Sequence, residues 1–131
     1  MFNRRQTRNG GVFTLCLLVV ACTPVDEPLE PEYGAINTRL LDGELVSIDV
    51  IMKNATDVDQ VIAFNDCAAA QYALIRGSGF VRRVTNDVQR RGRTWTGAGV
   101  YTLSDQHPGG GTAIDAEVVA AACQADGIPV V

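Results

Sequence analysis

The clearest pattern in the chain is the alternation of apolar and polar residues over residues 45–53. One side of this segment carries Val46, Ile48, Val50 and Met52. Successive side chains of a β-strand point to opposite faces of a sheet, so this pattern predicts a strand with one buried face.

A second pattern, over residues 57–76, has apolar residues at steps of three and four and predicts an amphipathic helix. We expect Thr56 to be the N-cap, because its hydroxyl can accept a hydrogen bond from the first turn. The glycines of residues 77–79 are typical of a helix end. The apolar stripe consists of Val58, Val61, Ile62, Ala68, Ala69 and Tyr72.

Residues 80–89 and 93–103 predict two strands that pair as a hairpin through a turn at residues 89–92. Each segment is rich in β-branched and aromatic residues, which favour strands. One face of the first strand is expected to carry the apolar residues Phe80, Val84 and Val88.

The pattern of residues 112–123 is ambiguous. Apolar residues alternate as in a strand, whereas the alanines at 120–122 and the later Gly127 are typical of a helix and its end. We expect a strand, because a third pairing would cover the open edge of the hairpin. The predicted fold class is α+β: one amphipathic helix packed on a small antiparallel sheet, in the order β-α-β-β-β.

The N-terminal residues have the pattern of a secretory signal peptide. Residues 1–11 carry three Arg and no acid, residues 12–21 are uncharged and almost wholly apolar, and Cys22 follows directly. The apolar run is too short for a membrane-spanning helix. Residues 19–22 (VVAC) resemble the lipobox of bacterial lipoproteins, in which an aliphatic, a variable and a small residue precede the cysteine.

This resemblance, which is limited to the export segment, implies that residues 1–21 are removed as a lipoprotein signal peptide. It also implies that Cys22 receives acyl chains such as palmitate, which anchor the protein in the membrane. Two or more chains give stable attachment, whereas one is marginal. Thr23 stands where lipoproteins retained in the inner membrane typically carry Asp, so the resemblance favours the periplasmic side of the outer membrane.

Removal of residues 1–21 takes away three of the 11 basic residues and none of the 15 acids, so the net charge changes from −4 to −7. Residues 22–33 hold Cys22 and then four acids among three prolines, which predicts an extended tether. Residues 34–131 form the single domain that we expect. This acidic balance argues against nucleic acid as a partner.

Two further cysteines, Cys67 and Cys123, predict a disulfide, because exported proteins meet an oxidising compartment. In the chain-entropy model such a bridge contributes about 4 kcal/mol. Cys67 lies nearly opposite Val58 on the predicted helix, away from part of the apolar stripe. Either a C-terminal segment covers that side of the helix, or the helix is shorter than predicted.

No residues stand at the spacing of a catalytic or metal site. His107 is the only histidine, and it lies in a Pro- and Gly-rich loop with only Asp105 near it. Four acids could pair in space as acid and base, but their spacing does not favour it: Asp49, Asp66, Asp115 and Glu117. We therefore expect no enzymatic activity, no metal and no cofactor.

Two groups of residues are candidate binding surfaces. The first is the set of arginines on the predicted hairpin: Arg82, Arg83, Arg90, Arg91 and Arg93. These cations either discourage aggregation at a sheet edge, or dock on an anionic partner or on lipid head groups. The second is the strand face that Trp95 and Tyr101 share with Gly97 and Gly99. This gap either admits a helix or a bulge, or forms a shallow aromatic groove.

These observations predict a lipid-anchored, periplasm-facing protein of the bacterial envelope that binds a protein partner or supports the envelope without catalysis. The alternative is a protein that binds a small ligand or cell-wall fragment through Trp95 and Tyr101. Two tests distinguish these hypotheses. If the hairpin binds a protein partner, Arg→Glu changes there would abolish that binding, and if the protein binds a cell-wall fragment, the fragment would shift the fluorescence of Trp95.

Overall fold

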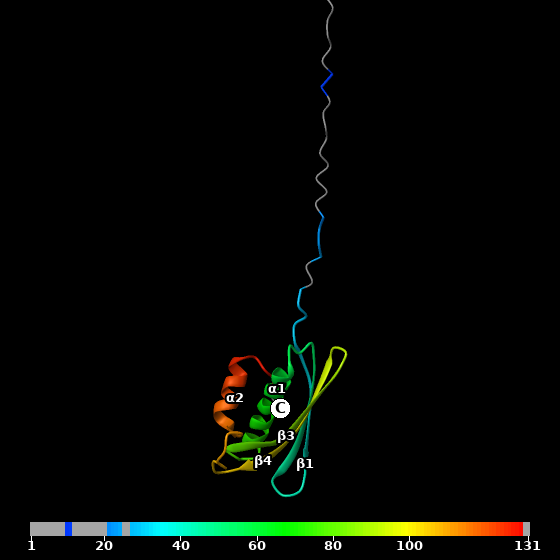
Figure 1. The fold of residues 1–131 in the computed structure, drawn as a ribbon. Coiled ribbons are helices and arrows are strands. Elements are labelled where there is room, and N and C mark those ends of the chain that lie inside the picture. The colour runs from blue at the N-terminus through cyan, green and yellow to red at the C-terminus, as the bar shows by residue number, and fades with distance from the viewer. Residues whose placement is uncertain (1–9, 12–20, 25–26, 130–131) are drawn as a thin grey trace, which may run out of the picture.

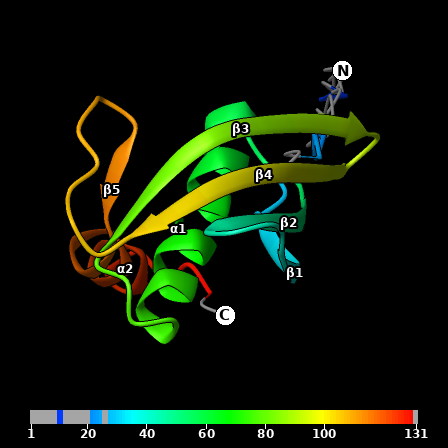
Figure 2. The same cartoon turned by 90° about the horizontal axis from the view of Figure 1, so that it is seen from below.

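Two helices and five strands follow one another in the described part of the computed structural model, which comprises residues 10–11, 21–24 and 27–129. Their order is β1 Glu32–Leu40, β2 Leu45–Lys53, α1 Val58–Ile75, β3 Phe80–Arg91, β4 Thr94–Ser104, β5 Ala113–Asp115 and α2 Ala116–Ala125. The strands form one antiparallel sheet in the spatial order β1-β2-β4-β3-β5. Figures 1 and 2 show a curled sheet with both helices on one side. The predicted α+β class is confirmed.

The core lies between α1 and the side of the sheet that faces it. Strand β2 has the predicted bounds, and its four apolar residues on the predicted face are fully buried. From α1 the core receives Val61, Phe64 and several alanines, whereas Val58 is 46% exposed and lies outside it. Small side chains on α1 let the helix lie close to the sheet, which excludes water from both.

Helix α1 begins and ends within one residue of the prediction, but its N-cap differs. The Gln60 backbone N–H donates to the Asp57 side chain at 2.8 Å, so Asp57 is the cap. Thr56 instead donates its backbone N–H to the Gln60 side chain at 2.7 Å. The helix ends where Gly77 adopts φ +79° and the Ser78 N–H reaches back to Ala73 at 2.8 Å.

The predicted hairpin is formed by β3 and β4, but the residue faces on β3 were predicted wrongly. A β-bulge between Arg83 and Thr85 inserts an extra residue and shifts the alternation. As a result Val81 is fully buried, whereas Val84 is 50% exposed. The turn also lies later than predicted, at residues 92–93, where Gly92 adopts φ +63°.

The expected strand at residues 112–123 is wrong for most of its length. Only Ala113–Asp115 forms a strand, paired with the start of β3, and Ala116–Ala125 forms a second helix. The Asp115 side chain caps this helix by accepting from the Val118 N–H at 3.2 Å. Alanine favours a helix, and the packing of α2 on α1 buries Ala116 and Ala120. The domain therefore has two helices where the sequence predicted one.

A disulfide joins the two helices between Cys67 and Cys123, whose Cα atoms lie 5.9 Å apart. The predicted bridge is confirmed, and it links positions 56 residues apart in the sequence. It also settles which alternative holds for Cys67: a C-terminal segment, α2, covers that side of α1, and α1 is only one residue shorter at each end than predicted.

Strand β1 was not predicted. It begins at Glu32, within the last residues of the segment predicted as a tether, and forms one edge of the sheet. A bulge between Tyr33 and Ile36 places its two core-facing apolar residues three positions apart, so no alternation is visible in the sequence. Most of the other residues of the strand are exposed.

Candidate functional site

A cluster of polar side chains connects α1 to the sheet. Arg83 on β3 donates to both carboxylate oxygens of Asp66 on α1, from Nε to Oδ1 at 3.0 Å and from Nη2 to Oδ2 at 2.6 Å. The hydroxyl of Tyr101 on β4 donates to Asp66 Oδ1 at 2.8 Å. Paired hydrogen bonds between guanidinium and carboxylate are strong and directional. Asp66 therefore fixes the helix against two strands at once.

The electrostatics of this cluster favour a structural role. Burial raises the pKa of the Tyr101 phenol above its ordinary value, and the nearby negative charge of Asp66 raises it further. The hydrogen bond to Asp66 raises the pKa of Arg83. At physiological pH the phenol therefore keeps its proton and acts as a donor, and the guanidinium stays charged. Neither group can serve there as a base or nucleophile.

Two asparagines with buried, unpaired amide atoms lie beside this cluster. Asn65 on α1 is fully buried, and neither atom of its amide has a protein hydrogen-bond partner. Asn86 on β3 donates to the Tyr101 hydroxyl at 3.5 Å, while its Oδ1 is unpaired. A Cβ atom at Gly97 or Gly99 would lie within 3.1 Å of the Asn65 amide nitrogen. The two glycines therefore give α1 the room to approach β4.

The aromatic strand face is part of the core. Tyr101 is fully buried and Trp95 is 7% exposed. The gap between them is filled by α1, because a Cβ at Gly97 would lie 2.9 Å from Val61. Of the two interpretations of this gap, the packing agrees with the one in which it admits a helix, and it argues against an open aromatic groove at Trp95 and Tyr101.

The five hairpin arginines do not form one surface. Neighbouring residues on a strand point to opposite faces of the sheet. Arg82 is therefore exposed on the face away from α1, here called the open face, while Arg83 turns inward to Asp66. At the other end of β3, Arg90 lies 5.0 Å above the ring centre of Trp95. Arg91 also lies on the open face. Along β3 it is about 30 Å from Arg82, since a strand rises about 3.3 Å per residue.

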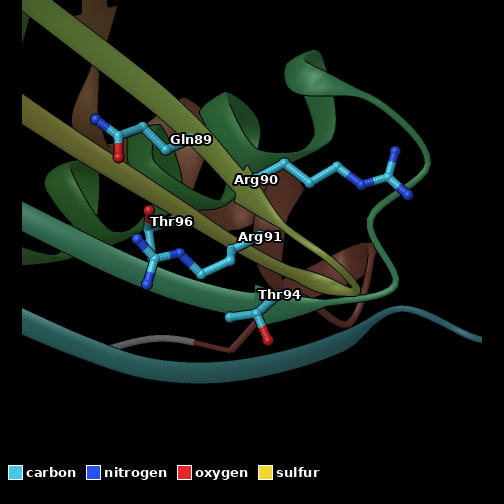
Figure 3. A pocket seen from close by; sticks show the side chains of 5 residues that line it. All are labelled: Gln89, Arg90, Arg91, Thr94 and Thr96. Atoms are coloured by element: carbon cyan, nitrogen blue, oxygen red, sulfur yellow. The ribbon is translucent and has the colours of Figure 1, made fainter.

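An open polar hollow, here called the hairpin pocket, lies beside the hairpin turn (Figure 3). Its volume is about 480 Å³. Figure 3 shows that Arg90 extends away from the other side chains. The lining residues are Gln89, Arg90, Arg91, Thr94 and Thr96. Guanidinium, amide and hydroxyl groups all donate hydrogen bonds, so the hollow is suited to an anion.

A second hollow, here called the helix groove, lies between α1 and α2 and has a volume of about 260 Å³. Val118 at its edge is 65% exposed, and the disulfide forms part of its wall. Its lining is mainly apolar: Ala63, Asp66, Cys67, Val118, Val119, Ala122, Cys123, Asp126 and Ile128.

The other candidate acids and the histidine lie apart. Asp49 is on the open face of β2, Asp115 caps α2, and Glu117 lies in the first turn of that helix. His107 lies in the loop after β4, where its Nδ1 accepts from the Gly109 N–H at 3.0 Å. Across residues 10–11, 21–24 and 27–129, no three His, Cys, Asp or Glu side chains are grouped as metal ligands.

Cys22 is exposed, and it takes no part in a disulfide within the described part of the chain. Most of the predicted signal peptide, including residues 19 and 20 of the VVAC sequence, lies outside the described residues. Among the helices that the structure describes, none has the length and apolar character needed to cross a membrane.

The register of the sheet places two residues, Lys53 and Thr94, next to the candidate binding residue Arg91, and sequence reasoning missed both. Lys53 on β2 pairs with Thr94 on β4, and Thr94 pairs with Arg91 on β3. A turn at residues 92–93 would have placed Thr94 opposite Arg91, because a two-residue connection fixes the hairpin register. The pairing with Lys53 joins segments about forty residues apart and has no such local signal.

The fold and its bridging disulfide define a small α+β domain of two helices on one side of a five-stranded sheet. Residues 33–127 match the family model of the YNQ4 C-terminal domain, and the chain belongs to this family. It is also similar to a protein of Paracoccus denitrificans, "Uncharacterized 26.9 kDa protein in nqo8 5'region". The two are 28% identical over 85 residues, which is 65% of this chain and 33% of that relative. No solved structure matches the chain.

Proposed function

We propose that this protein is a lipoprotein of the bacterial envelope, anchored through acyl chains on Cys22, whose folded domain binds a protein partner in the periplasm without catalysis. The outer membrane is the favoured location, since Thr23 rather than Asp follows the cysteine. The observation that carries the proposal is the separation of Cys22 from the domain.

This separation suits an anchor. The described residues between Cys22 and the start of β1 form no helix or strand, and Cys22 itself is exposed. At about 3.1 Å per residue, an extended proline-rich segment from Cys22 to Glu32 spans about 31 Å. Acyl chains on Cys22 could therefore enter a bilayer without disturbing the sheet.

The disulfide supports an exported location. Such bonds persist in the periplasm and are rare in the cytosol, where thiols are kept reduced. Cys67 and Cys123 are 2% and 4% exposed, so the bridge is part of the packed interface between α1 and α2.

The helix groove is the surface that best suits a protein partner. Its lining is mainly apolar, and Val118 at its edge is largely exposed. Asp126 also lines it, so a partner segment with an apolar side chain next to a cation would be complementary. The disulfide holds the two walls of the groove together.

The anchor is tested by labelling cells with a palmitate analogue. We expect the wild-type protein and a Cys16→Ser variant to incorporate the label, because Cys16 lies before the cleavage position. A Cys22→Ser variant should incorporate none. Label retained by Cys22→Ser would refute the anchor.

Partner binding is tested by crosslinking in intact envelopes. Val118→Asp places a charge in the helix groove, whereas Val84→Asp places one at a similarly exposed position on β3. We expect Val118→Asp to lose a specific crosslinked protein that Val84→Asp keeps. Loss of that protein only with Arg→Glu changes at Arg90, Arg91 and Arg93 would place the partner on the hairpin instead.

A further inference from the structure

The tether joins the domain at the end where the β3–β4 hairpin turns. The Asn54 side-chain amide donates to the Glu30 carbonyl at 3.2 Å, and its oxygen accepts from Arg93 Nε at 2.8 Å. Figure 1 shows the N-terminal segment leaving the domain beside the hairpin turn. An anchor at Cys22 would therefore hold this end of the domain nearest to the membrane.

At this end the open face of the sheet carries a row of three residues, here called the cation row. Thr94 stands between Lys53 and Arg91, its neighbours on the two adjacent strands. With strands about 4.8 Å apart, the two cations start from backbones about 10 Å apart. Both are exposed, and in the described part of the chain neither has a carboxylate oxygen within 4.0 Å.

The cation row borders the hairpin pocket. Arg91 and Thr94 line the pocket together with Thr96 and Gln89, which pair with each other in the next row of the open face. Phosphate oxygens accept hydrogen bonds from all four kinds of group present here: guanidinium, ammonium, hydroxyl and amide. The chemistry of this surface therefore matches the head group of an anionic phospholipid.

The charges along the open face favour contact with an anionic membrane by the hairpin-turn end of the domain alone. About 13 Å further along β4, Ala98 lies between two carboxylates, Asp49 and Asp87. An anionic membrane would repel these two acids if the whole face lay on it. At the tether end itself, Glu32 pairs with Lys53 and reduces its attraction to anions.

We propose that the cation row and the hairpin pocket bind phosphate groups of anionic phospholipids, so that the domain stands on the membrane with its hairpin turn toward the bilayer. This inference rests on the proposed anchor. The attraction of each cation, Lys53 or Arg91, to an anionic membrane is weak by itself, and the tether raises their effective concentration at the membrane surface. The orientation leaves the sides of the domain, the helix groove among them, facing the periplasm.

Energy transfer from Trp95 to a dansyl head group tests this orientation. Trp95 is the only tryptophan and precedes Thr96 on β4 at the hairpin end. The chain from Cys22, which keeps every described helix and strand, is coupled through its Cys22 thiol to a maleimide lipid. The attachment is then independent of lipidation in cells. We expect more efficient transfer in vesicles with phosphatidylglycerol than in phosphatidylcholine alone.

Single substitutions test whether the cation row causes the more efficient energy transfer in phosphatidylglycerol vesicles. Lys53→Gln and Arg91→Gln should each lower the ratio of docked to undocked domain about fivefold in phosphatidylglycerol vesicles. Glu32→Gln should raise it. Arg39→Gln, the matched control on the open face at the far end of the sheet, should leave it unchanged.

Equal transfer in the two kinds of vesicle would overturn the inference. So would an Arg39→Gln effect as large as that of Arg91→Gln, because the attraction would then come from net charge rather than from this end. Neither outcome bears on acylation in cells, which the Cys22→Ser labelling tests separately.

Discussion

The two faces of strand β4 differ in what their side chains do. On the face toward α1, two glycines lie between large side chains, and all of these residues are buried: Trp95, Gly97, Gly99, Tyr101 and Leu103. On the open face all side chains are small and most are partly or fully exposed: Thr94, Thr96, Ala98, Val100 and Thr102. One strand thus supplies both a face packed against α1 and the floor of a polar surface.

This difference separates positions that stabilise the fold from positions that are available for the proposed binding. The helix-facing side tolerates few substitutions, because α1, the glycines and the Asp66 cluster occupy fixed positions relative to one another. The open side makes few contacts that substitution would disturb. Changes on the first face should therefore alter the free energy of unfolding, and changes on the second should alter only binding.

The largest effect is expected from removing the disulfide. A Cys67→Ala/Cys123→Ala variant should lose about 4 kcal/mol of unfolding free energy, because the unfolded chain regains the freedom of a long loop. Denaturant unfolding followed by circular dichroism measures this loss. A change below about 1 kcal/mol would mean that α2 is held by packing alone.

The next effect concerns Gly99 on the helix-facing side. A Cβ at Gly99 would lie 2.6 Å from the ring of Tyr101, which its hydrogen bond to Asp66 holds in place. Gly99→Ala should therefore cost about 2–3 kcal/mol. Gly111→Ala is the matched control, since nothing lies within 4 Å of its Cβ position, and thermal unfolding should reveal no loss. Equal stability of the two variants would contradict the account of the glycine gap.

Tyr101→Phe should cost less, about 1.5 kcal/mol at neutral pH, because one hydrogen bond to a carboxylate is lost. Above about pH 10 the unfolded chain releases the phenol proton while the folded chain, whose Tyr101 pKa is raised, keeps it. The wild-type unfolding free energy should then fall by up to about 1.4 kcal/mol per pH unit relative to Tyr101→Phe. Denaturation between pH 8 and about pH 11 measures this, and parallel pH profiles would show that the phenol is not buried as described.

The smallest effect is expected on the open face. Thr96→Val keeps the shape of the side chain and should change the unfolding free energy by less than about 0.5 kcal/mol. It should nevertheless weaken docking to phosphatidylglycerol vesicles, because a hydroxyl of the hairpin pocket is lost. A large loss of stability would show that the open face also carries packing energy.

Local patterns predicted the parts of the fold whose burial is periodic. Strand β2 and helix α1 were predicted to within one residue because the apolar positions of each recur with the period of that structure. Strand β1 was missed because a bulge breaks its alternation. Helix α2 was predicted as a strand because its apolar residues alternate as in a strand, although its alanines favour a helix, and packing on α1 decides between the two.

The candidate surfaces depended on pairing that a single segment does not reveal. Strand alternation separates Arg82 from Arg83, so these two could have been assigned to opposite faces from the sequence. Arg90 and Arg91 could not, because the predicted turn at residues 89–92 contained them. The contacts of Asp66 with Arg83 and Tyr101 join residues 17 and 35 positions apart, and only the packed fold brings them together. The buried position of Trp95 likewise depends on where α1 crosses the sheet.

The central claim is that Cys22 holds the domain at the membrane, and intact mass spectrometry of the protein extracted from envelopes tests it most directly. The account predicts a chain that begins at Cys22 and carries the added mass of a diacylglyceryl group and a further acyl chain. A chain that retains residues 1–21, or one that begins at Cys22 with an unmodified thiol, would contradict it.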